Sequence, residues 1–208
     1  MNAKVEPLVS PLPMQAASQD IWHTKYQLKT KTGAAVDNDN IERVLGLVDG
    51  KPSRLKSKIL QANGIKKRHY AIDDTQLTVE SNAQLAAKAG NACMEAIGFN
   101  KRKIGLLSAA TSQGDFVLPG FGSMVQAQMQ LPDVELHTSH GICSSSMMAL
   151  KAAFNNVKCE SSENALVVAS ELTSRLFRNS RYEQLESNEI DFNAEFLRWM
   201  LSDGAGAL

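Results

Sequence analysis

Cys143 is the residue whose type and setting most favour nucleophilic chemistry in this sequence. It lies in His140-Gly-Ile-Cys-Ser-Ser-Ser, between a predicted strand and a predicted helix. Gly141 permits a tight turn, and the helix N-terminus supplies partial positive charge and free backbone N–H groups. Both favour a thiolate, and the N–H groups can hold a developing oxyanion. This arrangement predicts a cysteine nucleophile; a small buried residue at a helix start is the alternative.

The two other cysteines are expected to have no chemical role. Cys93 falls in a predicted apolar stripe with Leu85, Ala89 and Ile97, so we expect it in the core. Cys159 follows a predicted helix in a turn and is expected at the surface. Three cysteines form an odd set, and residues 1–13 contain no apolar signal-peptide core. The sequence therefore predicts free thiols and a cytoplasmic location.

Metal and phosphate sites are less well supported. His137 and His140 precede Cys143, and His and Cys are zinc ligands. On a strand these two histidines would point to opposite faces, and no fourth ligand has suitable spacing, so we predict no metal. The Asp203-Gly-Ala-Gly turn lacks both the lysine of a P-loop and a full GxGxxG pattern. We expect Asp203 to shape a turn.

Alternating strands and helices must position Cys143. Apolar runs predict strands over 104–110 and 165–169, and alternating apolar and polar residues predict a strand over 134–139. Apolar periodicity predicts helices over 81–97, 121–131 and 144–157. The last of these helices is expected to bury one face. Shorter helices are predicted over 41–46, with Asn40 as N-cap, and over 53–61, and a further strand over 21–29. The order predicts an α/β layered fold with a largely parallel sheet flanked by helices. The residues of the expected buried face are Met147, Leu150, Ala153, Phe154 and Val157.

Composition excludes several functional classes. The chain has 208 residues, and 22 Lys and Arg residues balance 22 Asp and Glu residues. Bulk charge therefore gives no sign of a nucleic-acid surface. Apolar residues make up 43% of the chain, as in soluble globular proteins. No apolar run approaches the ~18 residues that a membrane span requires.

Six segments, taken in order, resemble the N-terminal half of a thiolase-fold condensing enzyme of the ketoacyl-ACP synthase III type. The resemblance runs from about Tyr26 to Leu208, and its finer features are most similar to the dialkylresorcinol and flexirubin-type branch. The family's Cys-Ala-Gly-Phe is Cys143-Ser-Ser-Ser here. The six segments are Asn63-Gly-Ile-Lys-Lys-Arg, Asn82-Ala-Gln-Leu-Ala-Ala, Leu106 to Thr111 with Pro119, Gly141-Ile-Cys-Ser-Ser, Leu166-Val-Val-Ala-Ser-Glu and Ser202-Asp-Gly-Ala-Gly-Ala.

This resemblance implies acyl transfer to the Cys143 sulfur and then Claisen condensation, decarboxylative or not, in fatty-acid or lipid-like secondary-metabolite synthesis. Gly141, Cys143 and Ser144 would form the nucleophile turn. The partner His and Asn would come from a C-terminal half that this chain does not contain. No tightly bound cofactor is implied; the substrates would be acyl-CoA or acyl-ACP. The tryptophan that stacks on coenzyme A is missing near Ile59 and Leu60, which favours an acyl-carrier protein as the donor.

The resemblance also implies an organisation and an assembly. Residues 1–20 would be a loose arm and residues 21–208 the thiolase-like half-domain that carries the nucleophile. The strand over 134–139 would be an unprotected sheet edge that pairs with its twin in a homodimer. The loop from Gln113 to Leu118, with Phe116 and Leu118, would reach the neighbour's acyl pocket. Two alternatives are an acyltransferase of the same fold that acts on an alcohol or amine, and a non-catalytic partner subunit.

Overall fold

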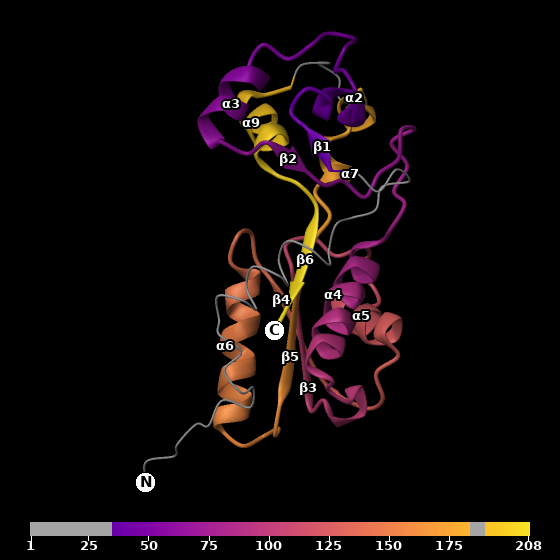
Figure 1. Cartoon of the computed structure of the whole chain (residues 1–208), viewed down its shortest axis with the longest axis vertical. Helices are drawn as coiled ribbons and strands as arrows, with labels where there is room; N and C mark the ends of the chain where they lie inside the picture. Colours follow the sequence, from indigo (N-terminus) through magenta and orange to yellow (C-terminus); the bar gives the residue numbers. More distant parts are fainter. Residues whose placement is uncertain (1–34, 184–189) are drawn as a thin grey trace. The chain divides into compact units, whose positions relative to one another are not determined.

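The computed structural model describes residues 35–183 and 190–208 (Figure 1). The described residues form two compact units. The sheet unit comprises Asn82–Ser170 and Ala205–Leu208, and the helical unit comprises residues 35–81 and Glu171–Gly204. The predicted arm over 1–20 and the predicted strand over 21–29 lie outside the described residues.

The sheet unit is built on a four-stranded sheet in the order β4-β3-β5-β6. Its central strand β3 pairs in parallel with β4 on one side and with β5 on the other. Val167 of β5 and Leu208 exchange both backbone hydrogen bonds at 2.9 Å, the pattern of an antiparallel pair. The predicted α/β layers and the largely parallel sheet are confirmed. The strand bounds are Leu106–Thr111 for β3, Glu135–His140 for β4, Ala165–Glu171 for β5 and Gly204–Ala207 for β6.

Strand β3 is buried along its whole length, because helices cover both faces of the sheet. Its side chains alternate between two cores. Leu107 and Ala109 belong to the core beneath helices α4 (Asn82–Ile97) and α5 (Phe121–Met129). Leu106 and Ala110 pack in a second core beneath helix α6 (Ser145–Lys158), which covers the opposite face (Figure 1).

Helix α4 places its predicted apolar stripe in the core. Leu85, Ala89 and Cys93 are buried, as expected. Ile97, the last residue of the helix, is 42% exposed, so the buried stripe ends at Met94. Burial raises the pKa of the Cys93 thiol, which keeps it in its neutral form.

The predicted buried face of α6 is wrong in part. Met147 and Phe154 are 66% and 53% exposed, and the buried residues are Ser145, Ala149 and Ala153. These small side chains recur every fourth residue, which lets the helix lie close to β3. Ser108 of β3 donates from Oγ to the Ala149 carbonyl at 3.0 Å. Bulky side chains do not fit at this short separation, so they lie on the remaining faces of the helix.

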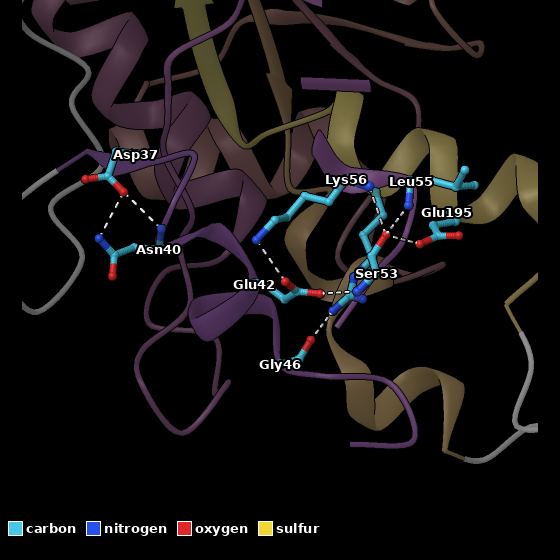
Figure 2. A network of polar contacts seen from close by, with 9 residues as sticks. Asp37, Asn40, Glu42, Gly46, Ser53, Leu55, Lys56 and Glu195 are labelled. Atoms are coloured by element: carbon cyan, nitrogen blue, oxygen red, sulfur yellow. Dashed lines mark hydrogen bonds and ion pairs between the residues drawn. The ribbon is translucent and has the colours of Figure 1, made fainter. Parts of the chain in front are cut away.

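The helical unit consists of short elements around one apolar core. The predicted helix at 41 is confirmed. Asn40 is its N-cap by position, but makes no side-chain cap; its N and Nδ2 instead donate to Asp37 (Figure 2). The elements are β1 (Val36–Asp37), α2 (Ile41–Leu45), α3 (Lys56–Asn63), β2 (Lys67–Arg68), α7 (Ser174–Phe177), α8 (Asn179–Tyr182) and α9 (Phe192–Met200).

Helix α3 begins at Lys56, three residues later than predicted. The reason is that the Ser53 hydroxyl accepts hydrogen bonds from the backbone N–H groups of Leu55 and Lys56, at 3.1 and 3.0 Å. The helix ends at Asn63, two residues later than predicted, before a left-handed Gly64. Among the described residues, no helix is both long and apolar enough to cross a bilayer.

Candidate active site

Cys143 occupies the turn between the end of β4 and the start of α6. Its side chain is exposed, and its backbone is left-handed with φ of 59°. A non-glycine residue in this region costs of order 1–3 kcal/mol, and such residues cluster at functional sites. The predicted order of strand, turn, cysteine and helix is therefore present, with a backbone distortion centred on the predicted nucleophile.

The carbonyl of Gly141 holds this turn together. It accepts the backbone N–H groups of Ser144 and Ser145, at 3.4 and 3.2 Å, and the Ser112 hydroxyl at 3.4 Å. The Ser144 N–H is thus used within the turn. The Ser112 contact joins the turn to the end of β3, so the two strand ends are tied at the candidate site.

Gly141 packs closely against the first turn of α6. A Cβ at this position would lie 3.0 Å from the Ser144 Oγ and 3.5 Å from the Met148 sulfur. Ser144 itself donates to that sulfur at 3.9 Å. A larger residue at 141 would require the Ser144 side chain, next to Cys143, to shift.

A buried polar network lies at the same edge of the sheet, centred on Asn82. Its Nδ2 donates to the Thr111 hydroxyl at 2.8 Å and to the Gln113 carbonyl at 3.1 Å. Its Oδ1 accepts from the Ser170 hydroxyl at 2.6 Å. Thr111 ends β3 and Ser170 lies at the end of β5, so one amide fixes two strand ends. Sequence analysis did not predict this network.

The loop after β3 is fixed at its base and open at its tip. The Asp115 carboxylate accepts the backbone N–H groups of Asn82 and Ala83 at 2.9 and 2.8 Å, which satisfies the start of α4. Beyond it, Phe116 and Leu118 are 70% and 83% exposed. Their predicted role beside a neighbouring subunit stays a prediction.

The two histidines before the turn do not converge. His137 is half-buried, and its Nδ1 lies 3.0 Å from the Ser108 hydroxyl and 3.5 Å from the Ser139 hydroxyl. His140 is exposed at the end of β4. Within residues 35–183 and 190–208, no group of three or more His, Cys, Asp or Glu side chains is arranged to hold a metal.

Asp203, in the helical unit, anchors the turn before β6. Its carboxylate accepts the N–H groups of Ala71 and Ser174, each at 2.7 Å, and the Ser174 hydroxyl at 2.5 Å. Burial raises the pKa of Asp203, and hydrogen bonds from Ser174, Ala71 and Thr173 oppose that rise. These hydrogen bonds connect Asp203 to neighbouring segments of the helical unit, as expected for a residue that shapes a turn.

The structure brings the predicted turn residues together at one edge of the sheet. Gly141, Cys143 and Ser144 follow β4, and Phe116 and Leu118 follow the adjacent strand β3. Because β3 and β4 are parallel, both loops leave from carboxyl ends, where α/β proteins commonly bind ligands. This edge can present an exposed thiol, a helix N-terminus and an apolar loop to a substrate.

Comparisons with known proteins identify similar chains. No family model matches. Beta-ketoacyl-(acyl-carrier-protein) synthase III from Sphingopyxis alaskensis is 30% identical over 150 residues, which cover 72% of this chain and 41% of that protein. The chain therefore spans less than half the length of this curated relative.

Solved structures share the fold. The tetronic acid condensing enzyme AbyA1 matches with a TM-score of 0.67 and 25% identity, over 84% of this chain and 50% of that one. 3-Oxoacyl-(acyl carrier protein) synthase III from Pseudomonas aeruginosa matches with a TM-score of 0.58 and 23% identity, over 84% and 46% of the two chains. An OleA variant from Xanthomonas campestris matches with a TM-score of 0.64 and 17% identity, over 83% and 50%.

Proposed function

Since this chain belongs to the ketoacyl-ACP synthase III-like condensing enzymes of the thiolase superfamily, we propose that it carries the nucleophile of an enzyme that condenses acyl thioesters. One observation carries the proposal: Cys143 is exposed and left-handed at the start of α6. Cys143 directly precedes Ser144, the N-cap of α6, so its sulfur lies close to the positive end of that helix. Neither Cys93, in the core, nor Cys159, after the last turn of α6, has such a setting.

The first half-reaction transfers the acyl group. The Cys143 thiolate attacks the carbonyl carbon of an acyl thioester and forms a new C–S bond. The Cys143 backbone N–H stabilises the oxyanion as a donor, and the positive end of the α6 dipole adds to this. The donor's C–S bond then breaks, and the donor leaves as a thiolate that takes up a proton.

The second half-reaction forms the carbon–carbon bond. A second thioester loses CO₂, or a proton, and its α-carbon attacks the acyl group on Cys143. The C–S bond to the enzyme breaks and the thiolate is regenerated. We expect a His and an Asn from a C-terminal half to stabilise the enolate.

The donor that we favour is an acyl-carrier protein, with acyl-CoA as the alternative and no tightly bound cofactor. Ile59 and Leu60 lie where a tryptophan would stack on coenzyme A, and both are buried. Neither side chain has an aromatic ring that could stack on adenine. Residues 144–146 are all serine, where the family has Ala-Gly-Phe. The acyl pocket would therefore be more polar next to Cys143.

A homodimer and a longer chain complete the proposal. Strand β4 is an edge of the sheet within this chain, and its Leu136 is 37% exposed. We expect the edge to pair with its twin, in a cytoplasmic protein with free thiols. The apolar Met147 and Phe154 side chains on the open face of α6 favour a second half that covers this helix.

Intact-protein mass spectrometry of the full-length protein tests the assignment. After incubation with an acyl thioester, the mass should rise by one acyl group in the wild type and in Cys159→Ala. Cys143→Ala should show no increase. Acylation that persists in Cys143→Ala and is lost in Cys159→Ala would refute the proposal.

A further inference from the structure

An apolar groove separates α3 from α9 in the helical unit. Its volume is about 420 Å³, and among the described residues Lys58 is the one charged residue that lines it. Each helix supplies apolar side chains from successive turns, so the groove runs between two helical walls. Its lining residues are Leu55, Lys58, Ile59, Ala62, Asn63, Phe192, Phe196 and Met200.

Polar contacts hold the two walls together at both ends. At one end, the Ser53 hydroxyl bonds to the Glu195 carboxylate of α9, and the Ser53 N–H donates to Glu42 at 2.6 Å (Figure 2). At the other end, Asn63 Nδ2 donates to the Trp199 carbonyl at 3.3 Å. The groove is therefore formed before any ligand arrives, which lowers the entropic cost of binding.

Two phenylalanines form its open side. Phe192 and Phe196 lie one helical turn apart on α9, with ring centroids 6.4 Å apart and ring planes 23° apart. They are 61% and 39% exposed. Exposed aromatic residues at the rim of an apolar groove are typical anchors of protein interfaces.

The α3 side of this groove carries one sign of charge. Residues 51–68 include seven Lys or Arg residues and no Asp or Glu, although the whole chain is neutral. Arg54, Lys58, Lys66 and Lys67 are exposed.

Local acids leave this cationic rim largely in place. Lys56 pairs with Glu42 at 2.8 Å, and Lys51 pairs with Asp49 at 2.6 Å. On α9, Glu195 is bound to Ser53, and Asp191 caps the helix by accepting from the Asn193 and Ala194 N–H groups.

We propose that this groove is a docking site for an amphipathic helix of a partner protein, whose polar face is acidic. The apolar face of that helix would contact Phe192, Phe196 and Ile59, and its carboxylates would face Arg54 and Lys58. A groove between two helices suits a third helix. A lipid surface would require protruding apolar side chains, whereas Ile59 lies buried in the groove floor. The inference goes beyond the proposed function and does not depend on Cys143.

Fluorescence anisotropy with the full-length protein tests this docking site. The probe is a labelled helical peptide of about 18 residues, long enough to be helical, with Leu and Phe on one face and Glu on the other. We expect binding that weakens as salt is raised. Phe196→Ala should weaken it about 30-fold and Lys58→Glu about 10-fold. Lys103→Glu, an exposed cation of the sheet unit, should change nothing, and Cys143→Ala should bind like the wild type.

Matched probes complete the test. The same peptide with Lys in place of Glu should bind at least about 10-fold more weakly. Equal affinity for both peptides, or indifference to Phe196→Ala in a variant with wild-type circular dichroism, would overturn the proposal. Binding of phosphatidylglycerol vesicles that is lost in Phe196→Ala and Lys58→Glu, without peptide binding, would also overturn it in favour of a membrane contact.

Discussion

The sheet unit and the helical unit are stabilised in different ways. The cores of the sheet unit contain many small side chains, such as Ala86, Ala109 and Ala149, and its buried polar groups are mainly uncharged. The helical unit buries Arg68, Arg198 and Asp203. The stability of the sheet unit therefore depends mainly on close packing of small side chains. The stability of the helical unit depends on hydrogen bonds to its buried charged groups. Mutations that add volume should damage one, and mutations that remove a polar partner should damage the other.

Arg198 is the strongest test on the charged side of this comparison. Its guanidinium donates to the carbonyls of Phe177 at 2.8 Å, Leu45 at 3.0 Å and Gly46. Burial lowers its pKa. Arg198→Met leaves these carbonyls without their donor, so we expect a loss of about 3–5 kcal/mol in the free energy of unfolding of the full-length protein, measured in urea.

Hydrogen exchange locates that loss. Exchange should rise within 35–81 and 171–204 and stay near wild type within 82–170. Arg102→Met, at an exposed arginine in the sheet unit, should change stability by less than about 0.5 kcal/mol. Uniform loss of protection in both units would show that they unfold together and would remove the contrast.

Gly122 tests the close packing of the sheet unit. A Cβ at this position would lie 2.5 Å from the Thr138 hydroxyl, which also accepts the Gly122 N–H at 3.2 Å. Gly122→Ala should therefore cost about 1–3 kcal/mol, measured by thermal or urea unfolding. Gly120→Ala, which meets nothing within 4 Å, should cost less than Gly122→Ala, because it loses only the preference for glycine over alanine at the N-cap of α5. A second change, Thr138→Ala, should recover part of the loss at 122; no recovery would argue against the clash.

The pH dependence of stability probes Asp203. Its pKa in the folded state lies above the ordinary value near 3.8 because of burial. Because the folded state then binds the proton more tightly than the unfolded state does, Asp203 contributes most to folding stability below its unfolded pKa. That contribution is lost as the pH rises through its folded pKa. The stability advantage of the wild type over Asp203→Asn should thus shrink between pH 4 and neutral pH, in urea titrations at each pH. An advantage that grows with pH would show that the hydrogen bonds outweigh burial.

The smallest expected difference is in the rates at which the three cysteine thiols are alkylated. Cys93 is buried with a raised pKa, whereas Cys143 and Cys159 are exposed. Iodoacetamide at neutral pH should label the two exposed thiols first and Cys93 only on unfolding, as followed by peptide mass spectrometry. Early labelling of Cys93 would mean that the sheet unit opens locally.

The sequence predicted the sheet better than the faces and contacts around it. Strands β3, β4 and β5 lie within two residues of their predicted starts, because short apolar runs are distinctive. The buried face of α6 was wrong because that helix carries two apolar stripes, and periodicity does not say which of them meets the sheet. Packing distance decided in favour of Ala149 and Ala153.

The sequence predicted where the candidate site lies in the chain, but not the backbone conformation or the hydrogen bonds of that site. Strand and helix patterns located Cys143 in its turn. Its left-handed backbone could not be predicted, because no sequence pattern marks a residue other than glycine as left-handed. The Asn82 network joins residues up to 88 positions apart, so no local pattern reveals it. Helix α9 was not predicted, although Phe192 and Phe196 at a spacing of four were a usable signal.

The left-handed backbone of Cys143 has a consequence for protein engineering. Cys143→Gly would relieve the strain of that turn, worth about 1 kcal/mol, while it removes the sulfur. A screen that rewards heat resistance alone would therefore favour the loss of the proposed nucleophile. Any directed-evolution campaign on this chain needs an acylation readout in every round, because stability and chemistry make opposing demands on one residue.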